Sequence, residues 1–334
     1  MSAWRAAILT MALSTFAGRA IVEGDDAAPQ RTTLIVVVGA AGEAEYGRDF
    51  DEEVATWQRT ADECGAQLHV VGGDDPKVDE VGEKLATDKD RLATLLASET
   101  GMAASEAPLW LVLIGHGTFD GRTAAFNLRG PDVTATELAG WLKSCPRPLA
   151  VIDTTAASGP FLTALSAPGR VIVTATKSGQ ERNYARFGRF FARRAIDPSV
   201  DLDKDDQTSL FEAFLAAGRD TVEFYKDEGR IMTEHPLLDD NGDGRGVRVD
   251  FFTGDKLAKS PTGERVADGA LARRLHLKPH ADEQRLSPEQ AAARDRLESE
   301  IAALRQRKSE LPEDEYYDQL ERLLVGLARL YGAR

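Results

Sequence analysis

The chain has 334 residues, a formal net charge of −14 and an isoelectric point near 4.9. Such an acidic balance argues against a nucleic-acid-binding surface, which needs a basic footprint. After the first twenty residues, apolar runs such as Thr33–Ala40 and Leu109–Ile114 have the length of strands, too short to cross a membrane. The length allows one large core together with an appendage.

The N-terminal twenty residues have the pattern of a secretory signal. Arg5 supplies a positive charge, Ala6–Ala17 is mostly apolar, and Gly18 and Ala20 are small residues before an expected cleavage after residue 20. We therefore expect a signal peptide over 1–20 and an extracytoplasmic protein, either periplasmic or secreted. The alternative is an N-terminal extension that is helical or disordered.

From Thr32 onward, short apolar strands alternate with amphipathic helices. This alternation predicts an α/β fold with a mostly parallel sheet and helices on both faces, and continuous apolar runs are typical of strands buried on both sides. The predicted strands are Thr33–Val38, Gln67–Val71, Leu109–Ile114, Leu149–Ile152 and Arg170–Thr174. The predicted helices are Tyr46–Glu63, Val78–Ser98, Ala135–Lys143, Gly159–Leu165, Ala185–Ala195 and Ser209–Asp227. Between the third strand and the third helix, Asp120-Gly121 within Thr118–Leu128 predicts a β-hairpin.

The C-terminal third changes character. We take 32–253 as the α/β domain and the charged residues 254–286 as a linker, because they carry prolines and glycines and little periodicity. Residues 287–334 predict a helical hairpin that starts at a Ser287 cap and is broken at Leu311-Pro312. The hairpin can pack back on the domain or mediate self-association.

The cysteines set few limits. Cys64 and Cys145 can form one disulfide in an oxidising compartment, but the sequence does not place them together. Two free, buried thiols are the alternative.

A histidine between two glycines follows the third predicted strand, in Ile114-Gly-His-Gly117. The carboxyl ends of neighbouring strands form the crevice where ligands and catalytic groups collect in open α/β sheets. His116 is therefore a candidate general base, with a hydrogen-bonded structural histidine as the alternative.

The next strand ends in a turn of small residues that closes with Ser158-Gly159. Together with the His116-Gly117 turn and the order of elements, this turn resembles the caspase-like fold of caspases, metacaspases and legumain-type cysteine peptidases. The resemblance covers roughly residues 32–235. It implies that His116 matches the histidine that pairs with a cysteine in an acidic-small-Cys-x-Ser-Gly turn.

The cysteine of that turn is missing. Counting back from Ser158-Gly159 places the nucleophile at Ala156, whereas counting forward from Asp153 places it at Thr155, since this turn is one residue longer. A methyl group has no nucleophilic chemistry, and a threonine hydroxyl needs strong activation. We expect Ser158 to cap the following helix. His116 would then be a vestigial base.

The loop after the fifth strand, Lys177-Ser-Gly-Gln-Glu-Arg182, lies where caspase-like enzymes place substrate-pocket residues. By this resemblance Glu181 and Arg182 are candidates to line a peptide groove. A solvated loop is the alternative.

One acidic loop has the spacing of an EF-hand calcium site. Its oxygen ligands would occupy positions 1, 3, 5, 7, 9 and 12, with position 7 acting through its carbonyl; the residues are Asp201, Asp203, Asp205, Gln207, Ser209 and Glu212. Position 6 is Asp206 instead of glycine, which should strain the turn and weaken binding. An acidic helix-capping loop is the alternative.

A second acidic loop repeats the first half of this pattern, with the glycine present. Asp239, Asn241 and Asp243 would be the ligands, but Asp250 stands where the closing glutamate is expected. A tight Asx and glycine turn explains this loop equally well. Calcium is thus the expected cofactor at one or both loops.

These patterns lead us to expect a non-catalytic, caspase-like pseudo-peptidase that serves as a protein-binding or scaffold module, stabilised by calcium. Its partner would be a protein or peptide that the sequence does not name. Two alternatives stay open. One is an active peptidase with His116 as base and Thr155 as nucleophile, and the other is a calcium-responsive interaction protein.

Overall fold

The computed structural model describes residues 31–73, 86–101, 107–254, 256–258, 268–278 and 286–332. The expected signal peptide lies outside the described residues. No helix in these ranges is both long and apolar enough to span a membrane.

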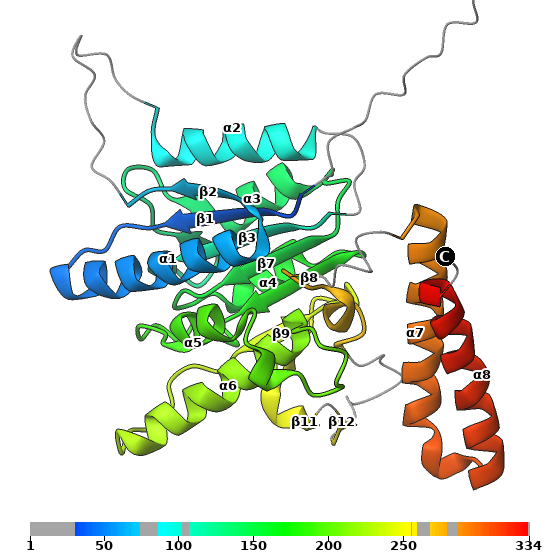
Figure 1. Cartoon of the computed structure of the whole chain (residues 1–334). Coiled ribbons are helices and arrows are strands. Elements are labelled where there is room, and N and C mark those ends of the chain that lie inside the picture. Colours follow the sequence, from blue (N-terminus) through cyan, green and yellow to red (C-terminus); the bar gives the residue numbers. More distant parts are fainter. Residues whose placement is uncertain are drawn as a thin grey trace, which may run out of the picture. The chain divides into compact units, whose positions relative to one another are not determined.

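A seven-stranded sheet forms the centre of the α/β domain, in the order β10-β9-β8-β7-β3-β1-β2 (Figure 1). The five strands from β8 to β2 are parallel, and β9 and β10 are antiparallel additions at one edge. Their bounds are β1 Thr33–Val38, β2 Gln67–Val71, β3 Leu109–Ile114, β7 Leu149–Asp153, β8 Arg170–Thr174, β9 Leu237–Asp239 and β10 Val247–Arg248. The predicted α/β class with a mostly parallel sheet is confirmed.

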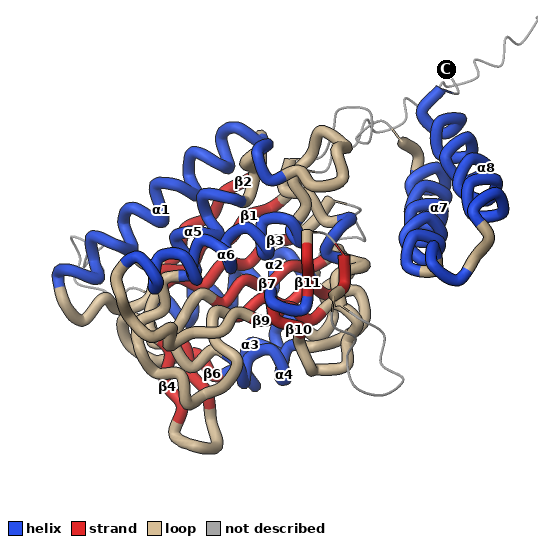
Figure 2. The backbone as a smooth tube through the Cα atoms, turned by 90° about the horizontal axis from the view of Figure 1, so that it is seen from below, coloured by secondary structure: helices blue, strands red, loops and turns tan. Residues whose placement is uncertain are grey.

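The helices cover both faces of the sheet, and Figure 2 shows the strands as one layer between them. On one face lie α1 Ala44–Cys64, α5 Phe187–Arg194 and α6 Leu210–Asp227, whose aromatic side chains join the core cluster of Leu34 and Val36. On the other face lie α2 Asp88–Thr100, α3 Ala135–Leu142 and α4 Gly159–Leu165, which pack against Ile35 and Val37. Alternate residues of β1 therefore enter opposite cores, as the pleat requires.

The predicted hairpin after β3 is present as a small antiparallel sheet. It consists of β4 Gly117–Phe119, β5 Ala124–Phe126 and β6 Val133–Thr134. The Asp120 carboxylate accepts hydrogen bonds from the backbone N–H groups of Arg122 and Thr123, which fixes the turn. The second predicted helix begins later than expected, at Asp88 after a Thr87 capping box. The part expected over 78–85 lies outside the described residues.

A buried arginine connects the chain segments at the amino ends of the parallel strands. The Arg147 guanidinium forms an ion pair with Glu99 and donates to Thr33 Oγ1 at 3.0 Å. It also donates to three backbone carbonyls, at Arg31, Ala107 and Pro108. The pair lies almost wholly inside the protein, with 3% and 7% of the two side chains exposed.

Part of the segment expected to be a linker packs on the domain. After the short strands β11 Phe252–Thr253 and β12 Lys256–Leu257, residues 268–277 run beside α6 and include the 3₁₀ helix η3 Ala272–Arg274. Ala272 and Leu277 are fully buried. The Asp240 carboxylate accepts backbone N–H bonds from 269, 271 and 272, and Asp268 accepts those of 240 and 241. These long-range caps fix a segment that has little periodicity of its own.

The C-terminal helices are α7 Pro288–Gln306 and α8 Glu313–Gly332, which pack against each other. Ser287 caps α7 through a capping box with Gln290, as its sequence predicts. The remaining short 3₁₀ turns are η1 Pro198–Val200, η2 Val249–Phe251 and η5 Lys308–Glu310.

Candidate functional site

The two turns singled out by the sequence are neighbours in space, because β3 and β7 are adjacent parallel strands. The chain leaves β3 at His116-Gly117 and leaves β7 through the turn Thr154–Ser158. A Cβ atom at Gly117 would lie 2.2 Å from the carbonyl oxygen of Ala156 and 2.7 Å from Thr155 Oγ1. The turns are therefore in contact, and only a glycine allows this approach. The element order and these two turns are those that the resemblance to the caspase-like fold leads us to expect.

His116 is enclosed by aromatic rings. Its imidazole lies 4.8 Å from the Tyr46 ring, 5.5 Å from Phe50 and 5.8 Å from Tyr184, measured between centroids. Nε2 lies 3.1 Å from the carbonyl oxygen of Ala41, and because a carbonyl only accepts, Nε2 carries the hydrogen. This nitrogen is thus occupied as a donor and cannot serve as a base.

The Thr155 side chain points inward. The residue has no exposed surface, and its hydroxyl donates to the Asp153 carboxylate at 2.7 Å. Burial raises the pKa of Asp153 to about 7. The second carboxyl oxygen, Oδ2, has no hydrogen-bond partner among the described residues. Thr155 and Asp153 are therefore a buried polar pair beneath the turn.

The rest of the turn is anchored to the loop after β8. Ala157 has a φ of 55°, in the left-handed region, and its N–H donates to the carbonyl oxygen of Glu181 at 2.7 Å. The Ser158 hydroxyl lies 3.0 Å from Thr176 Oγ1 and accepts the Thr176 N–H. Ser158 makes no side-chain cap to α4, so its expected capping role is wrong. Ala156 is 3% exposed.

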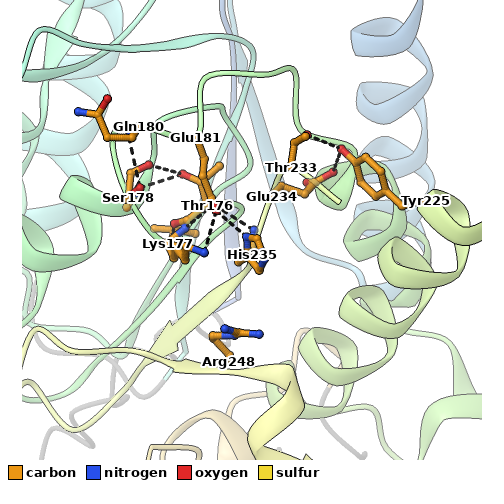
Figure 3. A network of polar contacts seen from close by, with 12 residues as sticks. Thr176, Lys177, Ser178, Gln180, Glu181, Tyr225, Thr233, Glu234, His235 and Arg248 are labelled. Atoms are coloured by element: carbon orange, nitrogen blue, oxygen red, sulfur yellow. Dashed lines mark hydrogen bonds and ion pairs between the residues drawn. The ribbon is translucent and has the colours of Figure 1, made fainter. Parts of the chain in front are cut away.

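Glu181 lies in a network with His235, a residue that the sequence did not single out as functional. Figure 3 shows the two side chains facing each other, and His235 Nδ1 lies 2.5 Å from Glu181 Oε1. The other carboxylate oxygen accepts the backbone N–H groups of Lys177 and His235. Arg182 is exposed and donates to Gln180 Oε1 at 3.4 Å. The Glu181 carboxylate thus binds the start of its own loop and His235, while Arg182 remains at the surface.

Next to this pair lies Glu234, whose contact with the Tyr225 hydroxyl is drawn in Figure 3. Its carboxylate accepts the backbone N–H groups of Arg186 and Phe187 and the hydroxyl of Tyr225. Burial raises the pKa of Glu234. This buried carboxyl therefore caps the backbone at the start of α5.

Glu53 is a second buried acid that sequence reasoning missed. It lies on the apolar face of α1 between Phe50 and Trp57, and 6% of it is exposed. A Cβ atom at Gly188 would lie 2.8 Å from Glu53 Oε1 and 2.6 Å from Thr154 Cβ, so Glu53 reaches the edge of the turn. Burial raises its pKa to about 8. An acid within an apolar helical stripe was the signal that could have identified it.

The first acidic loop brings three of its expected ligands together. Oxygens of Asp201, Asp203 and Asp205 all lie within 4.8 Å of one another. Burial, followed by the nearby charges of Asp205, Glu212 and Asp201, raises the pKa of Asp203 to about 6. Carboxylate oxygens are the ligands that calcium uses, but both oxygens of Asp201 also accept backbone N–H groups, those of Lys204 and Asp206.

The other expected ligands of this loop serve as caps. Ser209 and Glu212 form a capping box at the start of α6, and Glu212 Oε1 also accepts the N–H of Leu202 at 2.6 Å. Gln207 donates to Asp205 through its backbone and side-chain nitrogens. Asp206 has a φ of 64°, so it adopts the conformation for which EF-hand loops use glycine. The loop therefore combines an acidic cluster with a helix cap.

The second acidic loop is closed by its own backbone. Asp239 is fully buried, and its two carboxylate oxygens accept the N–H groups of Gly242 and Gly244. The Asn241 side-chain oxygen accepts the N–H of Asp243 at 2.8 Å. These contacts are those of the Asx-turn alternative.

Both cysteines, Cys64 and Cys145, are free thiols.

Comparisons with known proteins concern the fold alone. No family model matches the sequence, and no curated protein matches it. Among solved structures, a protein from Geobacter sulfurreducens matches with 10% identity and a TM-score of 0.43, over 64% of this chain and 94% of that one. The Drosophila initiator caspase Dronc matches with 14% identity and a TM-score of 0.41, over 68% and 89% of the chains. Caspase-1 from Spodoptera frugiperda matches with 9% identity and a TM-score of 0.41, over 65% and 89%.

Proposed function

We propose that this chain is a non-catalytic protein of caspase-like fold that serves as a protein-binding or scaffold module. The observation that carries the proposal is the Thr155 side chain, which is wholly buried and donates its hydroxyl to Asp153. At the other counted position, Ala156 offers a methyl group. Neither position presents a nucleophile to a peptide carbonyl outside the turn.

The surroundings of His116 support the same proposal. A catalytic base must reach the proton that it removes, within about 3 Å or through one water. His116 Nε2 instead donates to the Ala41 carbonyl, and rings of Tyr46, Phe50 and Tyr184 surround the imidazole. These rings pack against the histidine and limit the directions from which a bound peptide can meet it.

The rival proposal is an active peptidase with Thr155 as nucleophile. One observation favours it: a carboxyl with a pKa of about 7, that of Asp153, accepts the Thr155 hydroxyl and has the right basicity to take its proton. The burial of Thr155 weighs against it, since a substrate carbonyl needs open space at the hydroxyl oxygen.

The experiment compares wild type with Ala156→Cys and His116→Ala, using a peptide library and an electrophilic peptide that labels active nucleophiles. We expect wild type and His116→Ala to be equally silent, while Ala156→Cys reports whether a thiol in this turn can react. Thr118→Cys, an exposed thiol two residues beyond His116, controls for indiscriminate labelling. A wild-type adduct on Thr155 that disappears in His116→Ala would contradict the proposal.

We further propose that calcium binds the loop 201–212 and stabilises the fold. The convergence of the carboxylates of Asp201, Asp203 and Asp205 supports this role. Calcium should raise the melting temperature of the chain above its value in chelator, with magnesium much less effective because it prefers a smaller octahedral site. Asp203→Asn should remove the response, whereas Asp243→Asn, in the self-closed second loop, should keep it.

The C-terminal hairpin is the surface that we propose for protein contact, including self-association. Among the described residues, five large apolar side chains are exposed, and three of them, Tyr317, Leu324 and Val325, lie on α8. Light scattering of the full chain over a range of concentrations tests self-association. Leu324→Glu should lower any concentration-dependent mass, whereas Glu321→Gln on the same helix should not.

We also propose that the protein is exported. The N-terminal signal pattern supports this, and mass spectrometry of the protein recovered from its native compartment tests it. A mature chain that starts at residue 21 is expected. Recovery of the uncleaved chain from the cytosol would contradict the proposal.

A further inference from the structure

A cavity of about 220 Å³ lies between α1 and α5, beside the crevice described above. Residues of both helices line it, together with Tyr184 from the preceding loop. Since one water occupies about 30 Å³ of liquid, the cavity has room for about seven waters or for a small molecule of that size. Its volume therefore suits a small ion.

Two residues that line this cavity each carry a buried polar atom without a hydrogen-bond partner. Glu53, which is 6% exposed, has no hydrogen bond at Oε1, and Arg189 has none at Nε, within the part of the chain that the structure describes. Buried polar atoms without partners are rare in native proteins, because each costs about 1–3 kcal/mol. Both helices that form the cavity thus carry hydrogen-bonding capacity that no described residue uses.

Three arginines line the cavity together with three acidic side chains. Arg59, Arg189 and Arg193 line it, and the ion pairs of the described residues include none of the three. Of its carboxylates, Asp49 is paired with an arginine outside the cavity, at 2.9 Å, and Glu52 is exposed at the rim.

Glu53 adds little negative charge at neutral pH, because burial raises its pKa to about 8. Its protonated carboxyl is a hydrogen-bond donor. The Arg189 guanidinium is held over the rings of Phe190 and Phe224, with its carbon 4.7 and 4.5 Å from their centroids. Both rings line a neighbouring pocket that shares Arg189 and Arg193 with this cavity, so the two arginines lie between the two hollows.

We propose that this cavity binds a small oxyanion, a carboxylate or a phosphate group, through Arg189, Arg193 and the carboxyl of Glu53. Guanidinium groups match the geometry of both anions with paired hydrogen bonds. The site is separate from the loop 201–212 and from the Thr155 turn. Tyr184 lines the cavity and also packs on His116, so a bound anion lies next to the crevice without entering it.

The first test is calorimetric titration of the full chain with sodium phosphate and, separately, sodium succinate, at an ionic strength held constant with sodium chloride. Wild type should bind at least one of the two, and the stronger probe identifies the anion class. Arg193→Gln should weaken binding at least tenfold, and because Arg193 is exposed the fold should persist. Arg48→Gln removes the same charge from an exposed position of α1 outside the cavity and should bind as wild type does.

A second test separates Glu53 from general charge effects. The charged groups facing it are Asp49, Glu52 and Arg59 from α1, Arg186, Arg189 and Arg193 from α5 and the loop before it, and the Tyr184 phenol. Such groups ordinarily titrate well outside pH 7–9. Succinate affinity of wild type should therefore fall as pH rises through about 8, while Glu53→Gln, which keeps an N–H donor, should bind without this dependence. Phosphate changes charge near neutrality, so this comparison uses succinate.

Two outcomes would overturn the proposal. One is a wild-type chain whose heats with both anions equal those with sodium chloride, which would leave water as the occupant of the cavity. The other is equal affinity for wild type and Arg193→Gln, which would place the anion elsewhere.

Discussion

Glu53→Gln is expected to make the chain more stable at neutral and alkaline pH. Glu53 is buried on the apolar face of α1, and burial raises its pKa from 4.5 to about 8. When the folded pKa lies above the unfolded one, the protonated group contributes stability that is complete below the unfolded pKa. That stability is lost as the pH rises through the folded pKa.

The size of the effect follows from the width of this window. Each unit of pKa difference corresponds to about 1.4 kcal/mol, so a rise from 4.5 to about 8 is worth at most roughly 5 kcal/mol. The free energy of unfolding of wild type should fall by about 1.4 kcal/mol per pH unit between pH 5 and pH 8 because of Glu53. Glutamine cannot ionise, so the variant should lack this contribution. Asp153 is present in both proteins, and its similar dependence cancels in the difference.

Urea unfolding at a series of pH values from 5 to 8.5, followed by tryptophan fluorescence, measures the difference. We expect the gap between variant and wild type to widen steadily across this range. Glu52→Gln, at the neighbouring exposed position, is the matched control and should leave the difference flat. A flat difference for Glu53→Gln as well would show that Glu53 is ionised or hydrated in the folded protein, and the reasoning from burial would be refuted.

Three further predictions concern stability. Arg147→Met leaves the Glu99 carboxylate buried without its partner, so urea unfolding should show a loss of about 3–5 kcal/mol, and a loss under 1 kcal/mol would contradict the role assigned to the pair. Gly117→Ala forces a methyl group against the Ala156 carbonyl oxygen and should cost about 1–3 kcal/mol, whereas Gly140→Ala, with open space around it in a helix, should cost nothing. In chelator, Asp203→Asn should raise the melting temperature by relieving repulsion among three carboxylates; a drop there would indicate that the clustered charges are compensated.

The five parallel strands could be predicted from sequence almost to the residue, because each is a continuous apolar run between polar segments, whereas the short strands β9 and β10 were not predicted. Thr33–Val38 and Leu109–Ile114 have the predicted bounds, and β7 extends the prediction only by Asp153. The packed segment 268–277 could not be predicted in the same way. Its position depends on hydrogen bonds to Asp240, which is about thirty residues away and shows no local pattern.

The sequence predicted that the two turns of the candidate site lie close together, but not how their side chains are oriented and packed. Parallel topology places His116 beside the turn after β7, so their proximity followed from the order of strands. That Thr155 turns inward depends on the burial of Asp153, and the closure around His116 depends on Tyr46 and Tyr184, which come from segments far apart in sequence. Side-chain orientation and ring packing of this kind are set by tertiary contacts, which periodicity does not encode.

The hydrogen bonds of the Arg147 guanidinium have a consequence for how the domain folds. Its partners stand between 39 and 116 residues away along the chain and come from three separate segments. None of these bonds can form within a locally folded fragment. The guanidinium therefore stays hydrated until the starts of β1, β3 and β7 and the end of α2 come together. Their formation is thereby all-or-none. Backbone amides at this edge of the sheet should exchange with solvent only through global unfolding, whereas the His116 edge can open on its own.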